Sequence, residues 1–194
     1  KFTPTVSVLD AAAANGIVAV HENGGPDISG IDDFLAIGAL DHPVQVRRYW
    51  GQLVESADHA TELMSITHAH ALGGDLFVDG AIGSHTAWIS EPYDDDPTST
   101  GICYVDGDAI RTQLRSCTEA GVQTGFHVIG DAATAAVVAA LDELAGELGT
   151  APLARLAHRL EHAEMVGVGQ AQTLASTGVV ASMTVGTGKQ AIGL

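Results

Sequence analysis

The stretch VQTGFHVIGDAATAAVVAALDELAGEL, residues 122–148, decides the fold class. Its first part, residues 122–128, contains the Val, Thr and Phe side chains that are typical of a strand. Its second part, residues 132–148, is dominated by Ala and Leu, which are strong helix formers, and Asp131 stands where a helix cap is expected. A strand that leads directly into a helix is the repeating unit of a parallel sheet covered by helices.

The same alternation extends in both directions along the chain. Strand-like segments occupy residues 17–20, 43–48, 76–78, 122–128, 155–162 and 179–182, and helical segments occupy 6–14, 31–40, 50–63, 108–120, 132–148 and 167–176. This pattern predicts one α/β domain over residues 1–194, built either as a doubly wound open sheet or as a (β/α)8 barrel. No G-x-G-x-x-G motif follows a strand, which weakens the dinucleotide-binding version of the open sheet. A complete barrel has eight strands and typically ~250 residues, so six strands fit an interrupted barrel.

Composition narrows the classes of partner. The formal net charge is −16, from 24 acidic and 8 basic residues, so nucleic acid and anionic membranes would be repelled, whereas divalent cations would be attracted. No apolar run approaches the length of a membrane span, and no signal peptide opens the sequence. The two cysteines, Cys103 and Cys117, are too few for a disulfide framework and favour buried, reduced thiols in a cytoplasmic protein. Because the first residue is Lys1, we expect the chain to begin inside a longer gene product.

Polar residues gather where the predicted strands end. They are His21 with Glu22, then Asp79, His127 and His162. In a barrel, the carboxyl ends of the strands surround the active site. His127 and His162 end consecutive strands, so their imidazoles could meet at one metal ion, imidazole being a common zinc ligand. From spacing alone, two structural histidines with ordinary hydrogen bonds remain an equally good interpretation.

Three other patterns predict ordinary surface structure. The pair His68 and His70 has a metal-binding spacing but lacks flanking apolar residues, which favours a solvated loop. The run 94–96 of three aspartates lacks the spacing of a calcium loop, and Cys103 and Cys117 are not spaced as a zinc pair. Ser84 does not stand in a G-x-S-x-G elbow, so a serine hydrolase is poorly supported.

Three motifs in order carry a family resemblance. LFVDGAIGSHTA at 76–87, followed by EPY at 91–93 and DP at 96–97, resembles the signature of amidohydrolase family 3, within the metal-dependent amidohydrolase superfamily. That group includes the YtcJ-like proteins and N-substituted formamide deformylase. FHVIGD at 126–131 and RLEHA at 159–163 resemble the family's fifth and sixth strands, and GIVAVHE at 16–22 is similar to its second.

The resemblance implies a partial (β/α)8 barrel that contains about strands 2–7 and lacks the first and last. It also implies a divalent metal, usually zinc, and water that attacks the carbonyl carbon of a small-molecule amide or formamide. His127 and His162 would be metal ligands, and Asp79, Gly80, Ser84 and Asp131 would shape the site. Further ligands are expected among His21, Glu22 and Asp75.

Departures from the family pattern matter equally. The H-x-H pair of the first strand and the aspartate of the eighth are absent, so no catalytic proton acceptor is identified. Asp75 stands where the family often has a lysine that can be carboxylated to bridge two metals, and the only lysines here are Lys1 and Lys189. His85 stands where an arginine is common.

We therefore expect the whole protein to be a hydrolase and this chain to be inactive alone. The metal can be absent from this chain when it is isolated. A competing hypothesis is a non-catalytic barrel fragment that acts only by self-association through open sheet edges. A lyase on a similar metal-using barrel is a third interpretation, which the motifs favour less.

Overall fold

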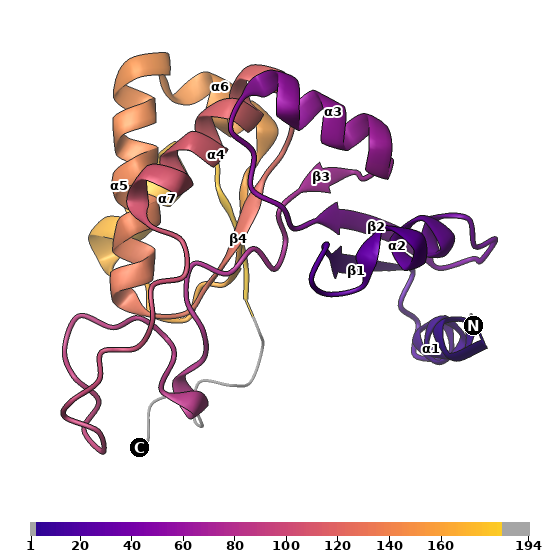
Figure 1. Ribbon diagram of the computed structural model, residues 1–194, viewed down its shortest axis with the longest axis horizontal. Coiled ribbons are helices and arrows are strands. Elements are labelled where there is room, and N and C mark those ends of the chain that lie inside the picture. The colour runs from indigo at the N-terminus through magenta and orange to yellow at the C-terminus, as the bar shows by residue number, and fades with distance from the viewer. Residues whose placement is uncertain (1–2, 184–194) are drawn as a thin grey trace.

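Six parallel strands follow one another in chain order, and helices connect them (Figure 1). The computed structural model describes residues 3–183. Within these residues the strands are β1 (Ala19–Gly24), β2 (Gln45–Trp50), β3 (Ala71–Leu72), β4 (Gly125–Val128), β5 (Arg159–His162) and β6 (Val180–Ser182). The helices are α1 (Thr3–Ala14), α2 (Gly30–Gly38), α3 (Ala57–Thr67), α4 (Gly107–Ala120), α5 (Asp131–Leu148), α6 (Thr150–Leu156) and α7 (Val168–Ser176), with a short 3-10 turn, η1, at Ile82–Ser84. The predicted α/β class with parallel sheets is confirmed.

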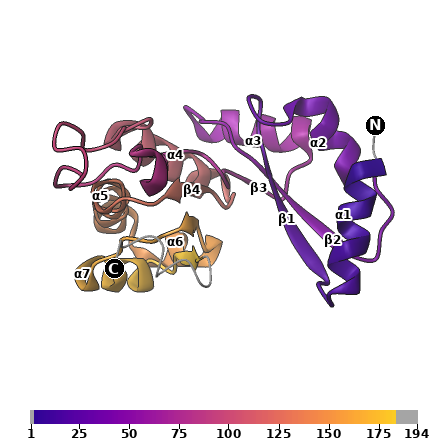
Figure 2. The ribbon, with the colours of Figure 1, turned by 90° about the horizontal axis from the view of Figure 1, so that it is seen from below.

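The strands form two three-stranded parallel sheets, β1-β2-β3 and β4-β5-β6. A parallel bridge between Leu72 and Thr124 joins them, and Leu72 N–H donates to the carbonyl of Gln123 at 3.0 Å. Helices α2, α3, α4, α5 and α7 succeed one another around the outer side of this curved array, and short α6 packs against α4 and α5 (Figure 2). Because the pairings within both sheets and the bridge between them are parallel, the carboxyl ends of all the strands lie along one edge.

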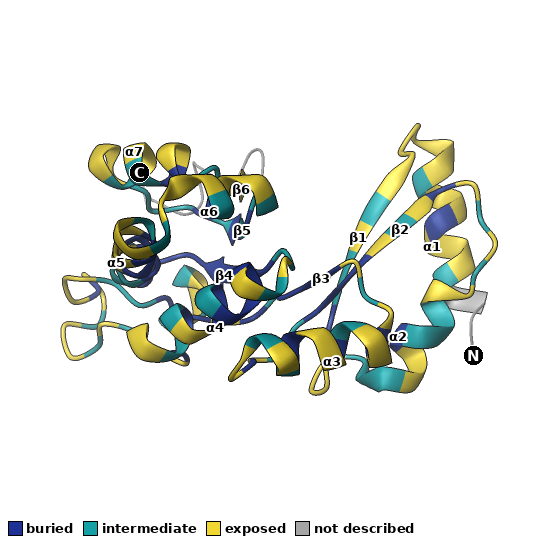
Figure 3. Ribbon diagram, turned by 90° about the horizontal axis from the view of Figure 1, so that it is seen from above, coloured by how far each residue is buried: buried dark blue, intermediate teal, exposed yellow. Residues whose placement is uncertain are grey.

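Apolar residues at helical spacing hold the helices to the sheets. On α5, Val137, Leu141 and Leu144 are buried, and on α4, Ile110 and Leu114 are buried, whereas the outward sides of these helices are exposed (Figure 3). These residues belong to the larger core, beneath α4, α5 and α7. A second, smaller core lies beneath α2 and α3 and includes Phe34, Trp50 and Leu72. Each half of the array thus has its own packed interior.

The third strand differs from its prediction. The expected strand at 76–78 is reduced to a single bridge between Phe77 and His127, and the paired strand is Ala71–Leu72 instead. Gly73 has φ +115°, and a Cβ there would lie 2.3 Å from the carbonyl oxygen of Gly125. The close approach of the two backbones ends β3 after two residues. The chain then returns to β4, where Val78 N–H donates to the carbonyl of His127 at 3.1 Å.

Other expected boundaries also shift. The helix expected at 50–63 begins only at Ala57, because Trp50 completes β2 and Ser56 caps the helix by accepting from His59 N–H at 3.1 Å. The strand expected at 155–162 begins at 159, since residues 150–156 form α6. Asp131 does not cap α5: Gly130 holds the cap position without a side-chain bond, and Asp131 is the first helical residue.

The cysteine and histidine-pair predictions change in detail. Both cysteines are free, as expected, but Cys103 is exposed and only Cys117 is buried. His68 ends α3 in a left-handed conformation and is exposed, in agreement with a loop. His70 instead accepts a hydrogen bond from Arg48 N–H at 3.1 Å, so it is a structural part of the β2–β3 pairing.

Among the residues that the structure describes, no helix is both long and apolar enough to cross a membrane.

Candidate metal centre

Three side chains from separate segments meet at the carboxyl edge of the second sheet. Asp75, His127 and His162 offer potential ligand atoms that all lie within 4.8 Å of one another. His162 pairs with Val128 in the register of β4 and β5, and its ring centroid lies 4.5 Å from that of His127. The Asp75 Oδ1 atom is 3.6 Å from His127 Nδ1 and 3.9 Å from His162 Nε2. Parallel neighbouring strands therefore bring the two predicted histidines together.

His127 is oriented by a hydrogen bond on the far side of its ring. Its Nε2 lies 3.0 Å from the carbonyl oxygen of Gly80, so Nε2 carries the proton and donates. Its Nδ1 atom is buried, faces Asp75 and has no hydrogen-bond partner. Phe77 stacks on the ring at a centroid distance of 4.5 Å. An oriented imidazole with a buried free lone pair is the arrangement expected of a metal ligand, whose other nitrogen is held by a carbonyl.

His162 reaches the site through a strained turn. Its φ is +72°, and Ala163 N–H donates both to the carbonyl of Glu161 at 3.0 Å and to that of Val128 at 2.9 Å. The bond to Glu161 closes a three-residue turn centred on the histidine. A non-glycine residue in this region costs on the order of 1–3 kcal/mol, and such strain concentrates at functional sites.

Asp75 and the two histidines affect each other's protonation. The imidazole of His127, and then that of His162, holds the pKa of Asp75 well below its ordinary value, although burial opposes this. The pKa of His162 is raised, chiefly by Asp75. Glu161 takes no part, because its carboxylate forms two hydrogen bonds with Arg159, at 2.7 and 3.0 Å. Asp75 is thus the one carboxylate that the described residues place between the two histidines.

Asp79 is a structural anchor beneath the site. It is fully buried, and its carboxylate accepts hydrogen bonds from the backbone N–H groups of Ile129 at 3.0 Å, Gly130 at 2.7 Å and Trp88 at 2.9 Å. These bonds tie the segment that contains Gly80 to the end of β4. Since the Gly80 carbonyl fixes the His127 ring, Asp79 acts on the cluster through position and not through contact.

The remaining residues predicted to shape the site lie in or against the loop between η1 and α4. Ser84 is exposed, and its Oγ is 2.7 Å from Thr86 Oγ1. Asp131 accepts from Ser90 N–H at 2.9 Å and from the hydroxyl of Ser90, which fastens the loop to the start of α5. Neither Ser84 nor Asp131 belongs to the three-residue cluster.

Two further predicted ligands stay apart from the cluster. His21 lies against Tyr49, at a ring-centroid distance of 5.2 Å, and burial lowers its pKa. Burial also raises the pKa of Glu22. Of the three additional ligands considered, the structure brings only Asp75 to the histidines. Phe77 was not foreseen; its position two residues after Asp75, on the same side of an extended segment, is the signal that points to it.

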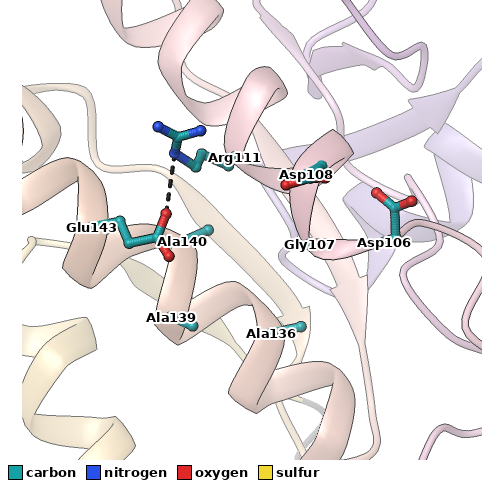
Figure 4. A pocket seen from close by; sticks show the side chains of 8 residues that line it. All are labelled: Asp106, Gly107, Asp108, Arg111, Ala136, Ala139, Ala140 and Glu143. Atoms are coloured by element: carbon teal, nitrogen blue, oxygen red, sulfur yellow. Dashed lines mark ion pairs between the residues drawn. The ribbon is translucent and has the colours of Figure 1, made fainter.

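A hollow of about 400 Å³ between α4 and α5 is a separate feature (Figure 4). It is lined by Ala136, Ala139 and Ala140, and by Arg111, whose Nε lies 3.1 Å from a carboxylate oxygen of Glu143. None of the cluster residues lines it, so it has no part in the metal centre.

A parallel α/β array with a His–His–Asp cluster at the carboxyl ends of its strands is an arrangement typical of metal-using α/β proteins. Comparison with known proteins gives the family. The amidohydrolase family model matches residues 6–190, and the chain belongs to this family.

Two named relatives share part of the sequence. The chain is 37% identical over 68 residues to YtcJ of Bacillus subtilis (strain 168), which is named as an amidohydrolase, covering 35% of this chain and 13% of that protein. It is 29% identical over 113 residues to LONG AFTER FAR-RED 3 of Arabidopsis thaliana, covering 58% of this chain and 19% of that protein. The chain thus spans under a fifth of the length of either relative.

Two archaeal crystal structures have the same fold. A metal-dependent hydrolase from Pyrococcus furiosus superposes with a TM-score of 0.62 at 24% identity, over 90% of this chain and 36% of that one. A metal-dependent hydrolase from Pyrococcus horikoshii OT3 gives a TM-score of 0.61 at 20% identity, over 89% and 34%. At these identities the likeness concerns the fold.

Proposed function

We propose that this chain carries the central part, about strands 2–7, of a metal-dependent amidohydrolase barrel that cleaves carbon–nitrogen bonds of small, non-peptide amides or formamides. The observation that carries the proposal is the cluster of Asp75, His127 and His162, with its buried and unpartnered Nδ1 atom. Family membership supports the reaction class, and both archaeal neighbours are named as metal-dependent hydrolases.

The donor set fits a divalent metal such as zinc. Imidazole nitrogen and carboxylate oxygen are both zinc ligands, and catalytic zinc sites usually have three protein ligands and an open position. When bound, the ion would lower the pKa of water and polarise the substrate carbonyl. Asp75 would supply the negative charge that, in the family pattern, a modified lysine supplies.

The chain's own residues would orient and shield the reaction. The Gly80 carbonyl holds the proton of His127 on Nε2, which leaves Nδ1 free for the ion. Phe77, 43% exposed beside His127, gives the site an apolar wall that excludes water from one side. The proton acceptor for the attacking water is not among the residues identified, so turnover is assigned to the whole protein.

Metal stoichiometry tests the proposal directly. We expect about one divalent ion per purified chain after zinc loading and dialysis, measured by elemental analysis. His127→Ala, His162→Ala and Asp75→Asn should each lose it. His59→Ala and Asp94→Asn are matched controls outside the cluster and should retain it. A chain without bound ion, or ion retained in all three cluster variants, would overturn the site.

Hydrolysis tests the reaction class separately. N-formyl and aryl amide substrates should be turned over by the full-length protein and not by its His127→Ala form. The chain described here should be inactive alone. Metal bound without amide hydrolysis in the full-length protein would keep the centre and reject the substrate class.

A non-catalytic role through self-association is the second proposal. Within the described residues β1 pairs only with β2, and β6 pairs only with β5, so both outer strands have a free edge.

We also propose a cytoplasmic location, which the two free cysteines support. The net charge of −16 disfavours nucleic acid and anionic membranes as partners.

A further inference from the structure

A second hollow, of about 440 Å³, lies at the amino end of β2. The end of α2, residues 44–48 and His70 line it. It exists because β3 pairs only with Tyr49 and Trp50, which leaves the first residues of β2 without a neighbour on that side. Since the strands are parallel, this hollow is at the opposite edge of the array from the Asp75–His127–His162 cluster.

The lining of this hollow is basic in an acidic protein. It contains His42, Arg47, Arg48 and His70 and no Asp or Glu, although acidic residues outnumber Lys and Arg by 24 to 8 in the chain. His42 is already satisfied, because its Nδ1 accepts from Val44 N–H at 3.0 Å and its Nε2 lies 3.2 Å from Asp10. The other three basic side chains form no ion pair with any described residue.

Arg48 is a buried cation without a carboxylate. It is 8% exposed, and its guanidinium donates to the carbonyls of Phe34 at 3.1 Å and His68 at 2.7 Å. Arg111, Arg115 and Arg159 all pair with glutamates, whereas in residues 3–183 no ion pair involves Arg48. Carbonyl dipoles offset only part of the cost of burying a charge, and two of its five N–H groups are used.

His70 and Arg47 add two more donors. His70 Nδ1 accepts from Arg48 N–H, so the ring proton lies on Nε2. Burial lowers the pKa of His70, and the neighbouring Arg47 and Arg48 lower it further. Arg47 is exposed and forms no ion pair within the part of the chain that the structure describes.

We infer that this hollow binds a phosphate group, held by the guanidinium groups of Arg47 and Arg48 and the Nε2–H of His70. Donors on three separate side chains match a tetrahedral oxyanion, which offers an acceptor to each, better than a planar carboxylate. Such a site goes beyond the proposed hydrolase function and uses none of its residues.

Inorganic phosphate and methyl phosphate are the probes, titrated at constant low ionic strength with chloride and acetate as comparison anions. Ring nitrogen chemical shifts of ¹⁵N-histidine-labelled chain follow His70. We expect a saturable shift of the His70 resonances with both phosphates and none with chloride. A shift with inorganic phosphate alone would mean that free phosphate is the ligand. Acetate binding as tightly as phosphate would contradict the oxyanion class.

Two variants separate a built site from general attraction. Arg47→Gln should weaken phosphate binding about ten-fold or more, while Arg155→Gln, the same charge change on exposed α6, should leave it unchanged. Gly38→Ala keeps every charge, but its Cβ would lie 2.2 Å from the Arg48 guanidinium carbon and displace it. Gly38→Ala should also weaken binding. Equal loss in Arg47→Gln and Arg155→Gln, or no saturable shift in the parent chain, would overturn the inference.

Discussion

His158 shows how one buried side chain can set the pH dependence of stability. Its Nδ1 accepts from Thr124 N–H at 3.1 Å, and its Nε2 lies 3.0 Å from Thr118 Oγ1. The ring thus connects α4, the start of β4 and the segment before β5. It is 1% exposed, and burial lowers its pKa to about 4. The folded protein therefore requires the neutral ring.

Acid should weaken the fold through this residue. The ring titrates near 6.5 when unfolded and near 4 when folded, so between these values the unfolded chain binds more protons. The free energy of unfolding should fall by up to about 3 kcal/mol as the pH is lowered from 6.5 to 4. Urea titrations across this window measure it. His158→Gln should flatten the profile and His59→Gln should not; an unchanged slope in His158→Gln would contradict the assignment.

The predictability of the metal centre also depends on single residues. His127 and His162 could be located from sequence because each ends an apolar strand, and strand ends converge in a parallel sheet. Asp75 could be considered only as one of several ligands, since nothing local shows that two glycines after Leu72 turn it toward β4. The positive φ of His162 has no sequence signal, because glycine is the usual residue at such an angle.

At the scale of elements, Asp79 joins the long loop to the end of β4. Replacing it with Asn keeps the shape but removes the charge, and turns one acceptor into a donor that faces backbone N–H groups. We expect a loss of about 3 kcal/mol in the free energy of unfolding, since hydrogen bonds to charged groups are each worth ~1.5–3 kcal/mol. The same change at exposed Asp94 is the control. Chemical denaturation measures both, and a difference below about 1 kcal/mol would contradict the anchoring role.

Helices and strands could be predicted from sequence where the hydrophobic periodicity agreed with the residues that mark the ends of the element. The α4 and α5 helices match their predicted ranges to within a residue, because Asp106 and Gly121 bound the first and Gly149 follows the second. The third strand could not be placed, since the backbone contact of Gly73 with Gly125 is tertiary and leaves no trace in local sequence. Short α6 could not be predicted, because its apolar residues are too few to show a helical period, and the strand expected at 155–162 overlaps its last two residues.

At the scale of the whole molecule, the parallel array has two free outer strands in the described residues. Val18, just before β1, is 76% exposed, and Val180 in β6 is 41% exposed. Unpaired edges flanked by apolar side chains invite pairing with another chain, and a charged residue on the edge suppresses it. The placement of these side chains gives the association hypothesis a specific surface to change.

We expect the chain to self-associate with increasing concentration in sedimentation velocity, and Val18→Lys to shift the distribution toward monomer. Val168→Lys is the matched control, because Val168 is 82% exposed on α7 and lies at no strand edge. Adding Lys changes the net charge equally in both variants, so any difference between them reports the edge and not general repulsion. A chain that is monomeric at every concentration would reject the association proposal. Equal dissociation in both variants would show that charge alone, without the β1 edge, governs assembly.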